Sequence, residues 1–112
     1  MDIKIQTYLL DIKVCIDEIN SFLGESRDFR LYKNDIKTKK AIERNLEIIG
    51  EAMNRITKID INFEIENSKN IIGTRNRIIH SYDNISDEVI WTIIIRDLPK
   101  LKIQIDELTK GL

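Results

Sequence analysis

A short polar segment in the second half of the chain holds the residue types best suited to chemistry. Residues 75–82 read Arg-Asn-Arg-Ile-Ile-His-Ser-Tyr, and His80 is the only histidine among the 112 residues. A histidine titrates near neutral pH and can take or give a proton, while an arginine holds phosphate oxygens and stabilises developing negative charge. These side chains could cleave an RNA phosphodiester bond with the 2′-hydroxyl as internal nucleophile, a reaction that needs no metal.

Helical geometry limits how these side chains can act together. Arg75 and His80 are five residues apart, which is about 140° around an α-helix. Asn76 and His80 share a face, as do Arg75 and Tyr82. Either the helix therefore ends at His80, or the working site combines residues from two chains. One histidine is also one short of a separate acid and base, and a two-fold dimer that brings His80 beside its symmetry mate would supply both.

Each of these residues also has an ordinary structural interpretation. A lone histidine beside isoleucines is more often structural than catalytic, and Tyr82 is more often an aromatic at the edge of a core. Arg75 lies on an apolar stripe, where it more often pairs with a buried acid, such as Glu47 or Glu51, than binds phosphate. The residues alone therefore indicate a helical bundle with a candidate site.

Length and composition limit the class of protein. The chain suits a single domain, residues 1–112. Its formal net charge is −1, so any contact with RNA must come from a local patch. One cysteine and one histidine cannot form an intramolecular disulfide or a His/Cys metal cluster. We expect a cytoplasmic protein, because no apolar run reaches the roughly 18 residues of a membrane helix and no signal peptide is visible. We expect no cofactor.

Four helices are expected to position the polar segment. Apolar residues at three- and four-residue steps predict a first helix over residues 3–23, stopped by Gly24, and a second that begins near Asp35. A third is expected over about residues 69–81, followed by a turn over residues 82–85. Scarce glycine and proline argue against a β-sandwich or barrel, so the predicted fold is an all-α bundle.

The fourth helix is nearly apolar all round at its start and is expected to be buried on several sides. Ser86 can cap it, and Pro99 should kink or divide it. Residues 25–37 are interpreted as a connection with a short helical turn. Residues 59–66 alternate like a strand but have no partner strand, so we expect an extended linker lying on the core.

Three further features stand out in the sequence. Two of them have both a structural and a functional interpretation, and the third has a structural one alone. Asn45 interrupts the apolar stripe of the second helix, either as a buried amide bonded to a neighbouring helix or as a site residue. The basic segment, residues 27–44, is either a solvated helix face or a surface for RNA or an acidic partner. Cys15 lies on the apolar stripe of the first helix and is interpreted as inert core.

The pattern Arg75-x4-His80-x-Tyr82 resembles the signature of the HEPN superfamily. More specifically, it resembles the HepT branch, the toxin half of HepT/MntA toxin–antitoxin pairs. Flanking segments are similar to other motifs of that family: residues 44–52 to its second helix, 71–76 to the run into the catalytic motif, and 91–101 to its last helix. The resemblance extends from about Tyr8 to Leu108.

The resemblance implies a four- to five-helix antiparallel bundle that forms a homodimer. Arg75 and His80 of both chains would line a shared cleft as catalytic residues, with Asn76 and Arg77 in supporting positions. It implies metal-independent endoribonuclease activity on RNA. It also implies a partner, a cognate MntA-like minimal nucleotidyltransferase that silences the toxin by adding AMP to Tyr82, which would place negative charge and bulk beside the site.

Two other functions remain open at this stage. The same fold could serve as a non-catalytic helical binding module that partners a nucleotidyltransferase. The chain could also be a purely structural helical dimer.

Overall fold

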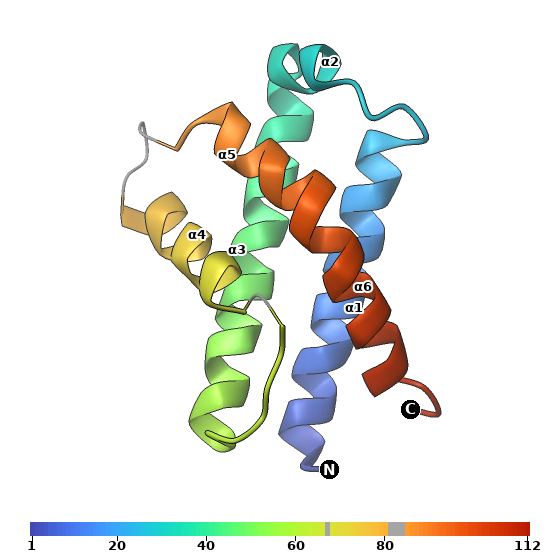
Figure 1. The fold of residues 1–112 in the computed structure, drawn as a ribbon, viewed down its shortest axis with the longest axis vertical. Helices are drawn as coiled ribbons and strands as arrows, with labels where there is room; N and C mark the ends of the chain where they lie inside the picture. Colours follow the sequence, from blue (N-terminus) through green and yellow to red (C-terminus); the bar gives the residue numbers. More distant parts are fainter. Residues whose placement is uncertain (67, 81–84) are drawn as a thin grey trace.

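Two long helices, α1 (Ile3–Leu23) and α3 (Ile36–Ile59), pack against each other and form one layer (Figure 1). A second layer crosses them: α4 (Ser68–His80) packs on α3, and the last helix packs on α1. This computed structural model describes residues 1–66, 68–80 and 85–112, with the backbone alone for His80. It measures 41 × 30 × 19 Å, and 19 Å is about two helix diameters. The described ranges contain no β-strand, so the predicted all-α bundle is confirmed.

The two long helices begin, and α1 ends, where the sequence predicted. The Asp2 carboxylate accepts hydrogen bonds from the backbone N–H groups of Lys4 (2.7 Å) and Ile5 (3.3 Å). Gly24 ends α1 with a φ of 66° and a ψ of −157°, a positive-φ conformation that favours glycine. Asp35 caps α3 by accepting from the N–H of Thr38 at 3.1 Å.

Three aromatic rings attach the short helix α2 (Phe29–Asn34) to the rest of the bundle. The Trp91 ring centroid lies 5.7 Å from that of Phe29 and 5.3 Å from that of Tyr32. Tyr32 is buried, and this burial raises the pKa of its phenol, with nearby Glu43 and Asp87 adding to the shift. The connection between the long helices is therefore a packed helical turn, as expected for residues 25–37.

The last helix is divided ahead of Pro99, as predicted. It consists of α5 (Asp87–Thr92), a π-helical turn η1 (Ile93–Asp97) and α6 (Leu98–Leu108). The N–H of Leu98 bonds to the carbonyl of Ile93, five residues back. Pro99 has no N–H to donate, so the wide turn falls where the regular helical ladder cannot continue. At the other end, Ser86 Oγ caps α5 by accepting from the Val89 N–H at 3.1 Å.

The prediction for residues 59–66 is wrong in its first half. Ile59 still belongs to α3, and Ile61 is 87% exposed in a turn that follows. Only the second half lies on the core, where Ile65 is buried. Hydrogen bonds join this part to α6: the Glu66 N–H donates to Gln104 Oε1 (2.9 Å). Strand-like alternation was misleading because the apolar stripe of α3 runs into it without a break.

The remaining boundaries follow the predictions closely. α4 begins at Ser68, one residue before the expected start, and its last residue is His80. Of the predicted turn over residues 82–85, residues 82–84 lie outside the described part. Cys15 is buried in the core, as expected. Among the described helices, none is both long and apolar enough to cross a membrane.

Candidate functional site

Helix α4 lies directly against the backbone of α3 at Gly50. A Cβ built on Gly50 would collide with Cβ and Cγ of Arg75 and would lie 3.2 Å from the carbonyl oxygen of Ile71. Gly50 has an ordinary helical backbone conformation, so glycine is needed here because it lacks a side chain and not because of its conformational freedom. The bare backbone at position 50 therefore lets the base of the Arg75 side chain lie against α3.

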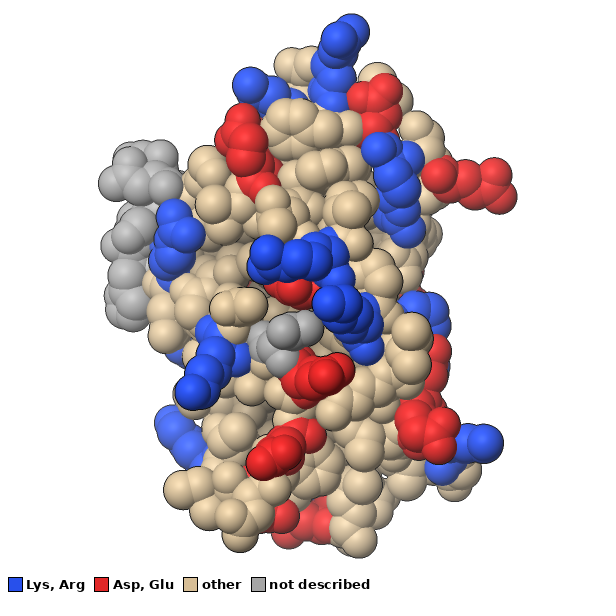
Figure 2. All heavy atoms as spheres, viewed as in Figure 1, with Lys and Arg blue, Asp and Glu red and all other residues tan. Residues whose placement is uncertain are grey.

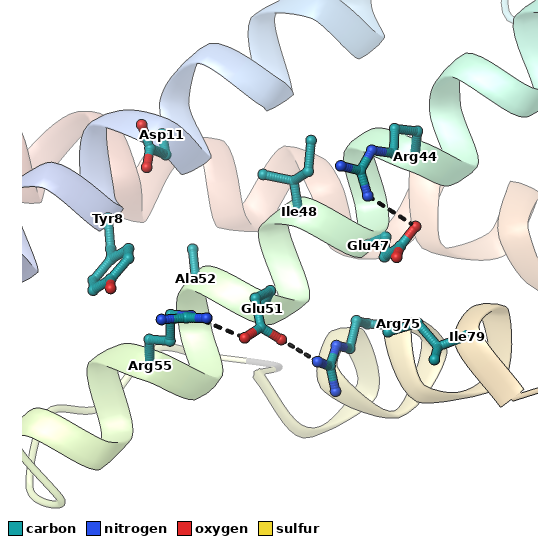
Figure 3. A pocket seen from close by; sticks show the side chains of 10 residues that line it. All are labelled: Tyr8, Asp11, Arg44, Glu47, Ile48, Glu51, Ala52, Arg55, Arg75 and Ile79. Carbon is teal, nitrogen blue, oxygen red and sulfur yellow. Dashed lines mark hydrogen bonds and ion pairs between the residues drawn. The ribbon is translucent and has the colours of Figure 1, made fainter.

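Glu51, the next residue on α3, holds the guanidinium of Arg75. Figure 3 shows Glu51 between two arginines, with one carboxylate oxygen turned to Arg55 and the other to Arg75. The Arg55 Nε donates to Oε1 at 2.9 Å, and the Arg75 Nη2 donates to Oε2. The expected pairing of Arg75 with a carboxylate is confirmed, and the partner is Glu51. Glu47 instead pairs with Arg44, at 3.4 Å.

These contacts determine the charge state of Glu51. Desolvation by itself would raise the pKa of the carboxyl group. The hydrogen bond from Arg55 and the positive charges of Arg75, Arg55 and Lys58 outweigh it, so the pKa lies below its ordinary value. Glu51 is therefore ionised at neutral pH and keeps Arg75 in one orientation.

Glu51, Arg55 and Arg75 line an open cleft of about 360 Å³ between α1, α3 and α4. Tyr8 and Asp11 reach it from α1, and Arg75 and Ile79 from α4 (Figure 3). Its charged side chains balance, three arginines against three carboxylates: Asp11, Arg44, Glu47, Glu51, Arg55 and Arg75. The cleft can thus hold one arginine firmly, but it carries no net positive charge of its own to attract a polyanion.

The predicted site residues are only partly brought together. Asn76 is exposed and accepts a hydrogen bond from Arg75 Nη1 at 2.6 Å through its side-chain oxygen. Arg77 lies about 160° from Arg75 around the helix and faces away from the cleft. His80 is the last residue of α4 that the structure describes, and residues 81–84 lie outside the described part, so the expectation that the helix ends there stays a prediction. The side chain of His80 and the whole of Tyr82 lie outside the described part of the chain.

Arg77 instead lines a second groove, of about 400 Å³, between α4 and the α5–η1 segment. Lys69 and Arg77 reach this groove from α4, and Arg96 from η1. Figure 2 shows Lys and Arg side chains over α4 and over the middle of the last helix. The groove could not be foreseen from sequence because its walls come from helices that are separate along the chain.

The basic segment, residues 27–44, is partly neutralised within the chain. Lys39 Nζ lies 3.0 Å from Asp87 Oδ1, and Arg44 Nη1 lies 3.4 Å from Glu47 Oε2. Lys37 and Lys40 are exposed. Both interpretations of this segment stay open. The same holds for Asn45, which is 5% exposed on the inner face of α3.

In the part of the chain that the structure describes, no three His, Cys, Asp or Glu side chains lie close enough to hold a metal ion. The sequence did not single out Arg55, Gly50 or Tyr8 as parts of the cleft. Arg55 could have been found from its four-residue spacing to Glu51, which places both on one face of a helix. Gly50 carried no such signal, because only the approach of α4 gives it a role.

Comparison with known proteins gives one family. The family model described as "Ribonuclease HepT-like" matches residues 12–108. "Putative RNase MJ0127" of Methanocaldococcus jannaschii is 32% identical over 109 residues, which cover 96% of this chain and 89% of that protein. "Probable ribonuclease HepT" of Thermococcus cleftensis is 34% identical over 104 residues, covering 92% and 94%. No solved structure matches the chain significantly.

Proposed function

Because the chain belongs to the HepT-like ribonuclease family, we propose that it is a toxin that cleaves RNA without a metal ion, using Arg75 and His80. Membership of this family makes the chain a ribonuclease. The toxin role, the catalytic residues, the homodimer and the regulating partner are the finer parts of the proposal. The observation that carries it is the position of Arg75, which Glu51 orients in an open cleft.

The chemistry that fits these residues is an internal transfer at phosphorus. The His80 imidazole takes the proton of a 2′-hydroxyl, and the 2′-oxygen attacks the adjacent phosphorus. The bond from phosphorus to the 5′-oxygen breaks, and that oxygen receives a proton from the protonated imidazolium of a second His80. Arg75 stabilises the negative charge that builds on the phosphoryl oxygens. The products are a 2′,3′-cyclic phosphate and a 5′-hydroxyl.

The need for two imidazoles supports a homodimer. Each chain has one histidine, so a separate acid and base require two copies of His80 across a two-fold axis. Helical positions 75 and 80 are also about 140° apart, so a cleft shared by two chains offers more ways to bring both to one phosphate.

Regulation is proposed at Tyr82, which follows His80 by two residues in the sequence. A cognate nucleotidyltransferase would transfer AMP from ATP to the Tyr82 hydroxyl and release pyrophosphate. The added phosphate carries negative charge close in sequence to His80, and it would repel the RNA backbone and occupy its place.

Incubation of the purified protein with tRNA and total RNA in the presence of a chelator tests the catalytic proposal. We expect the wild type to produce fragments that end in a 2′,3′-cyclic phosphate. His80→Ala and Arg75→Ala should abolish cleavage while the oligomeric state survives, and Lys40→Ala serves as an exposed control. Full cleavage by His80→Ala would refute the assignment. An inactive wild type that binds a nucleotidyltransferase would favour the non-catalytic binding module.

Mixed dimers test the shared cleft. Wild-type and His80→Ala chains with different tags are expressed together, and the mixed dimer is purified through both tags. If two imidazoles act on one phosphate, the mixed dimer should have far less than half of the wild-type activity. Half of the activity would show that each chain works alone.

Intact mass after mixing with the nucleotidyltransferase and ATP tests the regulatory proposal. A gain of one or more AMP units that maps to Tyr82 is expected, with loss of RNA cleavage. Tyr82→Phe should gain no AMP and stay active, whereas Tyr8→Phe should be modified like the wild type. Modification of Tyr82→Phe at an unchanged level would refute the assignment.

A further inference from the structure

The groove between α4 and the α5–η1 segment has a charge unlike that of the rest of the molecule. The chain as a whole has a net charge of −1, but no acidic side chain is found among the described residues that line this groove. Its three cationic residues are Lys69, Arg77 and Arg96; Arg96 is ion-paired with the buried Asp97, so Lys69 and Arg77 supply most of the positive charge. Such a local concentration of positive charge on a nearly neutral protein is the electrostatic footprint expected for a polyanion.

The cations of the groove are available to a ligand. Lys69 and Arg77 are exposed on α4, and their spacing of eight residues corresponds to about 12 Å along the helix. The guanidinium of Arg96 is oriented by Asp97: the Arg96 Nε donates to Asp97 Oδ1 at 2.8 Å, and the Arg96 Nη2 donates to Asp97 Oδ2 at 3.1 Å. Asp97 is buried while the Arg96 side chain is 57% exposed, so this pair orients the guanidinium without covering it. Helix α4 itself has no acidic residue from Ser68 to His80.

Gly73 gives a second, independent indication. It lines the groove in the middle of α4, where glycine weakens a helix relative to alanine. Apart from the two neighbouring residues and the nearby backbone of α4 itself, no described atom lies within 4 Å of a Cβ built on Gly73, and the φ of Gly73 is not positive. Nothing within the described chain therefore requires glycine here, in contrast to Gly50. A bare backbone on the wall of a cationic groove lets an external group come close to the helix.

We propose that this groove binds the phosphodiester backbone of single-stranded RNA and guides the strand along α4 toward His80. The proposal rests on the proposed function, since it assigns the RNA substrate a track outside the cleft of Arg75. It also removes a difficulty of that cleft, whose arginines are balanced by carboxylates. The cleft would supply one oriented arginine, and the groove would supply most of the affinity.

Fluorescence anisotropy with a short fluorescein-labelled RNA tests the groove. Its riboses carry 2′-O-methyl groups, so that the nucleophile is blocked and binding is measured without cleavage. Lys69→Gln/Arg77→Gln should bind this RNA roughly 10- to 30-fold more weakly than the wild type at about 0.1 M salt. The slope of log affinity against log salt should fall by about 1.4, because two phosphate contacts are lost. Both residues are exposed, so the melting temperature should change little.

Two further variants separate the groove from other causes. Lys37→Gln/Lys40→Gln removes the same charge from the basic segment and should leave RNA affinity within about twofold of the wild type. Gly73→Ala should weaken RNA binding although it stabilises the helix. Equal RNA affinity of wild type, Lys69→Gln/Arg77→Gln and Gly73→Ala would overturn the proposal. Loss of RNA affinity in Lys37→Gln/Lys40→Gln alone would also overturn it. Light scattering gives a third test, because dissociation of a dimer by the groove substitutions would overturn the proposal as well.

The outcome also distinguishes the groove from the nuclease activity. Cleavage of unmodified RNA by the wild type, with binding that ignores the groove substitutions, would reject the groove and keep the ribonuclease. Groove-dependent binding without any cleavage would reject the catalytic proposal and keep the groove. An oligoglutamate peptide that binds the groove in preference to RNA would mark it as a surface for an acidic protein and overturn the proposal.

Discussion

Arg75 of α4 lies directly against Gly50 of α3, so closely that any side chain at position 50 would collide with it. The ion pair between Arg75 and Glu51 depends on this approach, because Glu51 follows Gly50 on the same helix. A glycine that makes room and a carboxylate that binds therefore position the arginine together.

Substitution of the two helical glycines should have opposite effects on stability. Gly50→Ala forces α4 away from α3 and should destabilise the fold by about 1–3 kcal/mol, as overpacking does. Gly73→Ala meets no neighbour and should stabilise it by about 0.5–1 kcal/mol. Urea unfolding of both variants measures the difference. Equal effects of the two substitutions would contradict the described contact between α3 and α4.

Glu51 should act on catalysis through Arg75. In Glu51→Gln the guanidinium of Arg75 loses its charged partner, and we expect kcat to fall about 10- to 100-fold with little change in KM. Arg55→Gln is the matched control, because it removes the other partner of Glu51 and leaves the Arg75 pair in place. A merely structural role would lower the melting temperature of both variants and leave kcat alone. A rate for Glu51→Gln at or above that of the wild type would reject the positioning role.

The contribution of the Glu51 pair to stability should vanish in acid. Its folded-state pKa is lowered, against a desolvation effect, by Arg55 and Arg75. A lowered pKa means that the pair stabilises the protein above the ordinary pKa of 4.5 and stops doing so as the pH falls through the folded value. Thermal melts should therefore separate wild type from Glu51→Gln at neutral pH by up to about 1 kcal/mol. The two curves should converge well below pH 4.5, and a constant difference would disagree with this assignment.

Cys15 should resist thiol reagents in the folded protein. Burial, followed by the nearby charges of Glu18 and Asp11, raises the pKa of its thiol to about 11, and the side chain is 5% exposed. At about pH 8 the reaction with a disulfide reagent should be at least roughly 100-fold slower than in urea, because little thiolate forms. Fast labelling of the native protein would show that α1 opens readily. Cys15→Ala supplies the unreactive blank.

The features that the sequence predicted correctly are local. The first helix, its stop at Gly24, the cap at Asp35 and the division at Pro99 all follow from periodicity and from backbone chemistry within a few residues. The residue types alone indicated a candidate site in a helical bundle, whereas the resemblance to the family's motifs indicated a ribonuclease. The linker over residues 59–66 was half wrong, because one pattern of isoleucines suits both the end of a helix and the start of an extended segment.

By itself the sequence determined an all-α bundle, an arginine on an apolar stripe that favours pairing with a carboxylate, and a polar segment in the last turns of a helix. Only the tertiary structure decided which carboxylate Arg75 meets, why position 50 has no side chain, and that Arg77 faces a different groove. The physical reason is that these relationships depend on the distance and rotation between two packed helices. Helical periodicity sets which residues share a face, but the packing of all the faces together sets what each face meets.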